Sequence, residues 1–408
     1  MLKFWIISVL VVFFTATLVL DRQISAGTDP FILVDTHIDV PYRLARDFED
    51  IGKRTERGDF DYPRASVGGL HAAFMSIFVP VEKQQPGTAR GFADHLIDLV
   101  ELVCRRNRDK FEIARSTEHL QQIVRSQRIA LALGIENGAA IEDDITNLEH
   151  FFQRGVRYIT LAHGKANQIA DSSYDDERPW DGLSPFGEDV VREMNRLGIV
   201  VDVSHITDEA VLDVLEVSSV PVLASHSSAR AFTPGFERNL SDELIEKIAA
   251  AGGVIQVNFG SAFLTETANR WYLDYFESES AYRTENALGQ YDPVPEFSRQ
   301  YRRNDPPPFA DIDDVLDHID HIVALVGIDH VGFGSDFDGV GDSLPDGLKS
   351  VADYPALLDG LRRRDYSEQD IRQIAGGNTL RVWRTAESYA EKRRVLREHR
   401  DFRTYGNR

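Results

Sequence analysis

Short apolar runs rich in β-branched residues recur along this chain, and a polar turn and then a helix-like stretch follow each of them. Apolar runs without polar alternation are typical of strands that are covered on both faces, as in parallel sheets. The pattern predicts eight such strands. They cover residues 31–39, 69–79, 129–137, 156–163, 198–205, 220–226, 253–259 and 330–338.

Helical patterns lie between these strands, for example at 93–106, 185–197 and 242–251. Ser241 precedes the third of them as a candidate N-cap, with acidic residues in the first turn. Eight strand–helix alternations predict an α/β fold of the closed (β/α)₈ type, a TIM barrel formed as one domain by residues 31–385. A doubly wound open sheet is the alternative.

Two segments fall outside this repeat. About fifty residues, 260–310, separate the last two predicted strands and are rich in Tyr, Glu, Arg and Pro. Long connections are often functional, so this one is interpreted as a lid, a subunit contact or an insertion without a role. Residues 386–408 form a charged, Arg-rich pattern that predicts a solvated helical tail.

The N-terminus has the pattern of a targeting segment. Lys3 is followed by the uncharged, mostly apolar residues 4–20, and the small residues 25–27 offer a weak cleavage site. Residues 1–26 are therefore expected to be a signal peptide or a membrane anchor, with Lys3 inside the cell. The domain that follows is expected to be exported to the periplasm or the extracellular space, anchored through residues 4–20 if the segment is not cleaved.

Charge and cysteine content exclude some partners and some kinds of metal site. The chain has 66 Asp and Glu against 45 Lys and Arg, a formal net charge of −21. Such a surface repels phosphate backbones, so nucleic acid is not expected as a partner. Because Cys104 is the only cysteine, an intrachain disulfide and Cys-rich zinc sites are excluded. Any metal must be held by His, Asp or Glu.

Residues with metal-binding side chains stand at the ends of six predicted strands. In a (β/α)₈ barrel these ends converge on one face, where active sites lie. A single histidine at a strand end is most often structural, but six strand ends that supply only metal-ligand types indicate one metal site. The residues are His37, Asp39, Glu136, His163, His205, His226 and Asp336.

The residue types indicate which metal. His37 and Asp39 are two apart on a strand and point to the same side. Imidazole and carboxylate without thiolate suit zinc, and also admit manganese, cobalt or nickel. His37, Asp39, His205 and His226 with a bridging Glu136 are more ligands than one catalytic zinc takes. Two ions that share Glu136 and a bridging hydroxide would use the whole set.

Seven motifs, in this order, resemble the membrane (renal) dipeptidase family of amidohydrolase-type metal-dependent barrels. They are VDTHID, GIENG, DVSHITD, ASHSSAR, the pair Arg238-Asn239, GGVIQVNF and GSDFDGV, and the resemblance runs from about Leu33 to Trp383. It implies a zinc-dependent hydrolase of small dipeptides.

The resemblance also implies roles for individual residues. One zinc would be bound by His37, Asp39 and Glu136, and the other by Glu136, His205 and His226. His163 would contact the substrate carbonyl and Asp336 would be the acid/base carboxylate. Arg238 would hold the substrate carboxylate, although one extra residue stands before it.

The sequence departs from the mammalian relatives in its single cysteine, which excludes their disulfides and leaves a homodimer of their type an open expectation. Two other readings also stay open. The same metal barrel can hydrolyse another small amide, lactam, lactone or ester, because the fold does not fix the substrate. An exported binding protein without catalysis is the other reading, and the complete ligand set argues against it.

Overall fold

A computed structural model describes residues 31–84, 87–289 and 293–405, with side chains as far as residue 397. Residues Ile32–Arg408 belong to one compact unit. The expected targeting segment, including residues 4–20 and 25–27, lies outside the described residues. Among the described residues, no helix combines the length and the apolar character needed to cross a membrane.

The centre of the unit is a parallel sheet that nearly closes into an eight-stranded barrel. Its strands follow the order β1-β2-β4-β5-β6-β7-β8-β9. Their bounds are Val34–Ile38, Ala72–Phe78, Ile129–Glu136, Val156–Thr160, Val200–Asp202, Leu223–Ala224, Val254–Val257 and Val331–Phe333. All eight coincide with predicted strands, each shorter than the apolar run that indicated it.

The last strand meets the first just beyond its end. A parallel bridge joins Ile38 to Phe337. Asp336 N donates to His37 O at 3.1 Å, and Asp39 N donates to Phe337 O at 2.9 Å. The (β/α)₈ prediction is therefore confirmed, and the open-sheet alternative is wrong.

One strand was not predicted. β3, Phe111–Ile113, pairs with the first residues of β4, on the edge of that strand that β5 occupies further along. It is only three residues long and has a charged residue, Glu112, at its centre. Neither its length nor its pattern distinguishes it from a loop.

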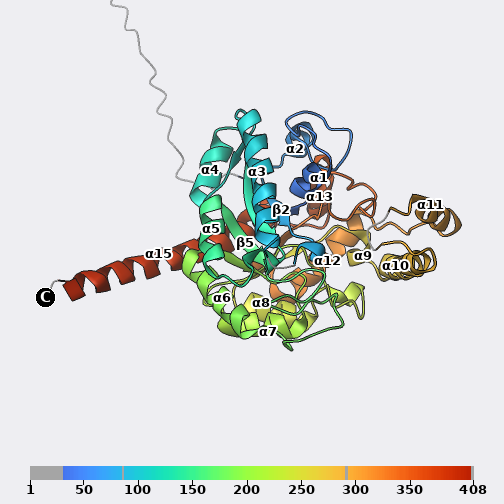
Figure 1. The fold of residues 1–408 in the computed structure, drawn as a ribbon. Helices are drawn as coiled ribbons and strands as arrows, with labels where there is room; N and C mark the ends of the chain where they lie inside the picture. The colour runs from blue at the N-terminus through green and yellow to red at the C-terminus, as the bar shows by residue number, and fades with distance from the viewer. Residues whose placement is uncertain (1–30, 85–86, 290–292, 406–408) are drawn as a thin grey trace, which may run out of the picture. The chain divides into compact units, whose positions relative to one another are not determined.

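Helices surround the barrel (Figure 1). The first half contributes α1 Val40–Arg46, α2 Tyr62–Gly68, α3 Ala89–Arg106, α4 Thr117–Arg125, α5 Thr146–Arg154, α6 Pro185–Leu197 and α7 Asp208–Val217. The second half contributes α8 Asp242–Ala250, α9 Ser261–Leu264, α10 Glu266–Glu285, α11 Pro295–Asn304, α12 Ile312–Val326, α13 Tyr354–Arg363, α14 Glu368–Arg372 and α15 Asn378–Tyr405. α6 has the predicted bounds. Ser241 caps α8 as expected, because its side chain accepts a hydrogen bond from Leu244 N at 3.3 Å.

The long connection after β8 is mostly helical. It contains α9, α10 and α11, and its aromatic side chains pack on one another. Trp271 stacks on Tyr275 with ring centroids 5.5 Å apart, and Phe297 and Tyr301 cover them from α11. The connection therefore has a small aromatic core of its own, which holds α10 against the mouth of the barrel.

The C-terminal helix closes the other end of the barrel. Trp383 and Ala386 of α15 are buried against the first residues of the strands, in a cluster that includes Ile32, Val34 and Phe74. The Phe74 and Trp383 rings are 5.4 Å apart. α15 continues without a break through residues 385 and 386, where the tail was expected to begin, and its later residues project from the barrel (Figure 1).

Candidate metal centre and active site

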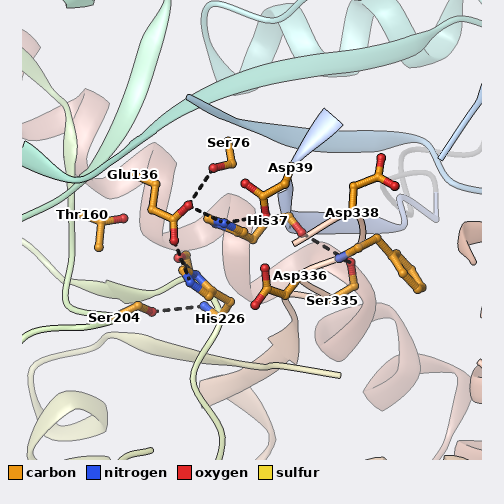
Figure 2. Close-up of polar contacts among 12 residues, drawn as sticks. His37, Asp39, Ser76, Glu136, Thr160, Ser204, His226, Ser335, Asp336 and Asp338 are labelled. Carbon is orange, nitrogen blue, oxygen red and sulfur yellow. Dashed lines mark hydrogen bonds and ion pairs between the residues drawn. The ribbon is translucent and has the colours of Figure 1, made fainter. Parts of the chain in front are cut away.

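The six strand ends bring their imidazoles and carboxylates together at one mouth of the barrel, around the Glu136 side chain. Figure 2 shows His37, Asp39, His226 and Asp336 beside Glu136. Glu136 Oε2 lies 3.3 Å from His37 Nε2. Its other oxygen, Oε1, lies 3.1 Å from His205 Nε2, 3.4 Å from His226 Nε2 and 3.3 Å from His163 Nε2. One carboxylate thus contacts four imidazoles with its two oxygens divided between them.

These separations fit a shared coordination sphere. Atoms bound to a tetrahedral zinc at its usual bond lengths lie about 3.3 Å from one another. Three groups of side chains each have their ligand atoms within 4.8 Å of one another. The groups are His37, Glu136 and His226; Glu136, His163 and His205; and His37, Asp39 and Asp336.

Hydrogen bonds to Nδ1 of His37 and His226 direct their Nε2 atoms into the cluster, where His226 Nε2 lies 2.8 Å from His205 Nε2. The Tyr158 hydroxyl donates to Thr36 O at 3.1 Å, so it accepts from His37 Nδ1 at 2.8 Å. The Ser225 hydroxyl donates to Asp202 at 2.6 Å and accepts in the same way from His226 Nδ1 at 2.6 Å. With the proton on Nδ1, the lone pair of Nε2 points into the cluster, as a metal-binding histidine requires.

Buried charge at the site also favours a cation. Burial, helped by the positive charges of neighbouring groups that include Arg238, lowers the pKa of His205 and of His226, so both rings are neutral. Burial raises the pKa of Asp39, and burial together with the charge of Asp39 raises the pKa of Asp336. Carboxylates crowded in a buried site need a positive partner to be ionised together. The residues present therefore fit a metal centre.

Several of the residues that shape the site have unusual backbone conformations. The φ angles of His205, Asp336 and Asn137 are 72°, 62° and 88°. Non-glycine residues rarely adopt positive φ, and those that do are concentrated at functional sites. The turn after β9 is also tight, since a Cβ at Gly339 would collide with the carboxylates of Asp39 and Asp336.

The two aspartates after β9 have different surroundings. Asp336 faces the cluster, and its Oδ2 accepts from Asn258 Nδ2 at 2.8 Å. Figure 2 shows Asp338 pointing away from the cluster. The Asp338 carboxylate accepts from Arg43 Nε at 3.0 Å and from Asp59 N at 2.6 Å, and Asp338 N donates to the Asp59 carboxylate at 2.9 Å. Asp338 thus fastens the loop before α2 to the end of β9.

His163 differs from the other imidazoles in exposure. Its side chain is 23% exposed, whereas those of His205 and His226 are 6% and 1% exposed. It contacts Glu136 and lines the cavity above the cluster. Of the four rings, it is therefore the one most open to a bound molecule.

Arg238 is buried beside the cluster and does not line the cavity. Its guanidinium donates to Ser227 Oγ at 2.8 Å and to His226 O at 2.9 Å. It also lies 5.3 Å from the ring centroid of Phe263, which is part of the cavity wall. Its Nε has no partner among the described residues. Arg230, by contrast, pairs with Asp208 at 2.5 Å.

The cavity above the cluster has a volume of about 680 Å³. Its floor includes Asp39, Glu136, His163, His205 and Asp336. Much of its wall is aromatic or aliphatic, formed by Tyr42, Phe78, Tyr174, Phe236, Phe263, Tyr272, Leu273, Phe276 and Val340. Helix α10 of the long connection supplies three of these residues, so that connection is part of the site.

Sequence reasoning missed the residues that orient the candidate ligands. Tyr158, Asp202, Ser225 and Asn258 all lie within or beside recognised strands, and all four are buried. The available signal was a polar side chain inside an otherwise apolar strand. Ser76, which donates to Glu136 Oε2 at 3.0 Å, is another case.

A parallel barrel with a histidine–carboxylate cluster at the carboxyl ends of its strands defines a metal-dependent hydrolase of the TIM-barrel class. The chain belongs to the membrane dipeptidase family (peptidase family M19), whose sequence profile matches residues 22–396.

Several known proteins similar to this chain are named as dipeptidases. A dipeptidase of Claviceps purpurea, tcpJ, is 31% identical over 350 residues, which cover 83% of this chain and 72% of that protein. An uncharacterized dipeptidase of Schizosaccharomyces pombe, C3A11.10c, is 32% identical over 373 residues, 88% of this chain and 81% of that protein. The crystal structure of the probable dipeptidase PvdM from Pseudomonas aeruginosa superposes with a TM-score of 0.75 at 29% identity, covering 88% of this chain and 96% of that one. The chain is thus a hydrolase of a metallopeptidase family, and the reading as a non-catalytic binding protein is set aside.

Proposed function

We propose that this protein hydrolyses small dipeptides with two zinc ions held by His37, Asp39, Glu136, His205 and His226. The observation that carries the proposal is the division of the Glu136 carboxylate between imidazoles on its two sides. One oxygen is close to His37 and the other to His205 and His226. This is the arrangement expected of a carboxylate that bridges two ions.

When bound there, the zinc ions would supply a water of lowered pKa and polarise the scissile carbonyl. The protein's own residues would do the rest. His163, the exposed imidazole, would donate a hydrogen bond to the carbonyl oxygen as negative charge develops on it. Asp336, with its raised pKa, would take a proton from the attacking water and return it to the leaving amine.

The cavity and Arg238 beside it would select the substrate. Its volume of about 680 Å³ suits a small molecule rather than a protein chain. Arg238, by the family resemblance, would hold the terminal carboxylate of the dipeptide; it lies buried behind the cavity wall beside Phe263, so its guanidinium, with the unpartnered Nε, would have to reach the cavity past that ring. The aromatic wall favours dipeptides with apolar side chains.

We also propose that residues 1–26 export the protein, so that the barrel works outside the cytoplasmic membrane. Support comes from the uncharged segment 4–20 after Lys3. The single cysteine does not help to choose between the two sides of the membrane, because a protein without disulfides can work on either side.

Metal analysis of the purified protein tests the two-zinc centre. We expect about two zinc ions per chain, loss of dipeptidase activity on chelation and recovery when zinc is restored. His226→Ala should retain about one ion, whereas His119→Ala, a histidine remote from the site, should retain two. A fully active protein with one ion per chain would contradict the two-metal proposal. Higher turnover of lactams, lactones or esters than of any dipeptide would move the substrate to the alternative class.

A further inference from the structure

A large groove lies at the opposite end of the barrel from the metal site. It has a volume of about 1220 Å³ and runs along α15, beside the ends of α4, α5 and α6. Eight arginines and five glutamates line it. Arg115, Arg157, Arg384, Arg393 and Arg397 have no carboxylate within ion-pair distance among the described residues.

These positive charges without ion pairs contrast with the chain as a whole, whose formal net charge is −21. α15 itself carries eight Arg and Lys against four Asp and Glu. At the base of the groove, burial and the neighbouring Arg115 lower the pKa of Arg157 to about 10. The guanidinium groups therefore repel one another, and an anion would relieve this repulsion.

The outer part of α15 combines this charge with exposed apolar side chains. All side chains from residue 391 to 397 are exposed, and Leu396 and Val395 are 62% and 38% exposed. Arginine beside exposed leucine on a helix is typical of segments that lie on a membrane surface. A groove for a small soluble anion would not require the apolar residues.

The position of the groove in the fold also indicates a membrane surface as the partner. α15 packs at the end of the barrel where the chain enters β1, since Ile32 and Trp383 belong to one buried cluster. Eleven residues, 21–31, separate Ile32 from the expected membrane segment 4–20, and a chain of that length spans at most about 40 Å. If the segment is retained in the membrane, this end of the barrel is the one held near the bilayer.

We propose that the groove and the exposed turns of α15 form a membrane-facing surface that binds the phosphate headgroups of anionic lipids. The acidic remainder of the protein is repelled by such a bilayer, so the interaction also orients the barrel. The metal site then opens away from the membrane, toward the soluble dipeptides.

Vesicle flotation tests the surface without the N-terminal segment. The protein is produced from Gly27 onward, which leaves the compact unit intact. It is mixed with vesicles of phosphatidylcholine alone or with added phosphatidylglycerol, at low and high salt. Each arginine near an anionic bilayer strengthens binding about fivefold. The triple variant Arg384→Glu, Arg393→Glu and Arg397→Glu should therefore bind the anionic vesicles at least tenfold more weakly.

A matched triple variant supplies the control. Arg54, Arg303 and Arg363 are exposed arginines without an ion pair among the described residues, and they lie elsewhere. Their replacement by Glu should leave vesicle binding within about twofold, and both triple variants should keep normal dipeptidase turnover. No binding of the parent protein to anionic vesicles, binding that high salt does not weaken, or equal loss in both variants would each overturn the proposal.

Discussion

Replacing Asp336 by asparagine separates proton transfer from structure at the metal site. The substitution preserves size and hydrogen bonding but removes a base that works near neutral pH. General acid–base catalysis usually contributes about 10²–10⁴ in rate, which corresponds to roughly 3–5 kcal/mol of activation free energy. We expect the metal-replete Asp336→Asn protein to lose turnover by that factor, with little change in bound zinc.

The structure predicts that the same variant is more stable than the parent when both are freed of metal. An asparagine can accept from Asn258 and donate to Asp39, whose carboxylate is hydrogen-bonded to Asp336. Because the folded-state pKa of Asp336 is raised, ionisation of this group costs stability above its unfolded pKa, and the cost grows with pH until the folded pKa is passed. The gain in melting temperature should therefore be larger at pH 8 than at pH 5, as thermal unfolding in chelator would show.

Asp338→Asn is the matched control, two residues away. Asp338 pairs with Arg43 and Asp59 rather than with the cluster. Weakening a hydrogen bond to a charged partner costs about 1.5–3 kcal/mol, so this variant should lose unfolding free energy and keep its turnover at low temperature. Near-normal turnover in metal-replete Asp336→Asn would refute the reasoning and move the proton-transfer role to His163.

Two further substitutions test the substrate-binding and orienting residues. Arg238→Ala should raise KM for free dipeptides by about 30-fold or more, from a loss of roughly 2–5 kcal/mol, and hardly affect dipeptides amidated at the C-terminus; the same selectivity in Arg230→Ala instead would show that the carboxylate is held elsewhere. Tyr158→Phe should weaken zinc binding about 10–100-fold in competition with a chelator, since His37 Nδ1 loses its acceptor, while Tyr389→Phe should not. Equal zinc affinity in the two tyrosine variants would remove Tyr158 from the support of the site.

Much of the barrel could be predicted from the sequence because a buried parallel strand has a continuous apolar pattern. The lengths of the strands could not be predicted in this way. The apolar run 220–226 contains only two residues in strand conformation, Leu223–Ala224, because residues 220–222 are irregular and Ser225 and His226 already form a turn. The candidate ligands were also recognisable, because imidazole and carboxylate side chains stand out at the ends of apolar runs.

The roles of the supporting polar residues and the packing of the C-terminal helix were harder to predict, because both depend on contacts with segments far away in the sequence. Tyr158 and Ser225 act through partners on other strands, so their role depends on the register of the closed barrel. The sequence of α15 predicts a solvated tail because charged residues dominate its composition. Its buried residues, Trp383 and Ala386, come before most of those charges and pack against strands far away in the sequence.

The packing of Trp383 against Phe74 also sets the order in which the molecule can be completed. The amino-terminal ends of the first strands stay uncovered until residue 386 has been made, near the end of synthesis. At usual rates of elongation a chain of 408 residues takes roughly 20–80 s to make, so the apolar base of the barrel lacks its cover for nearly all of that time. Until α15 covers it, this apolar surface is exposed on the growing chain, where it favours aggregation or the binding of a chaperone.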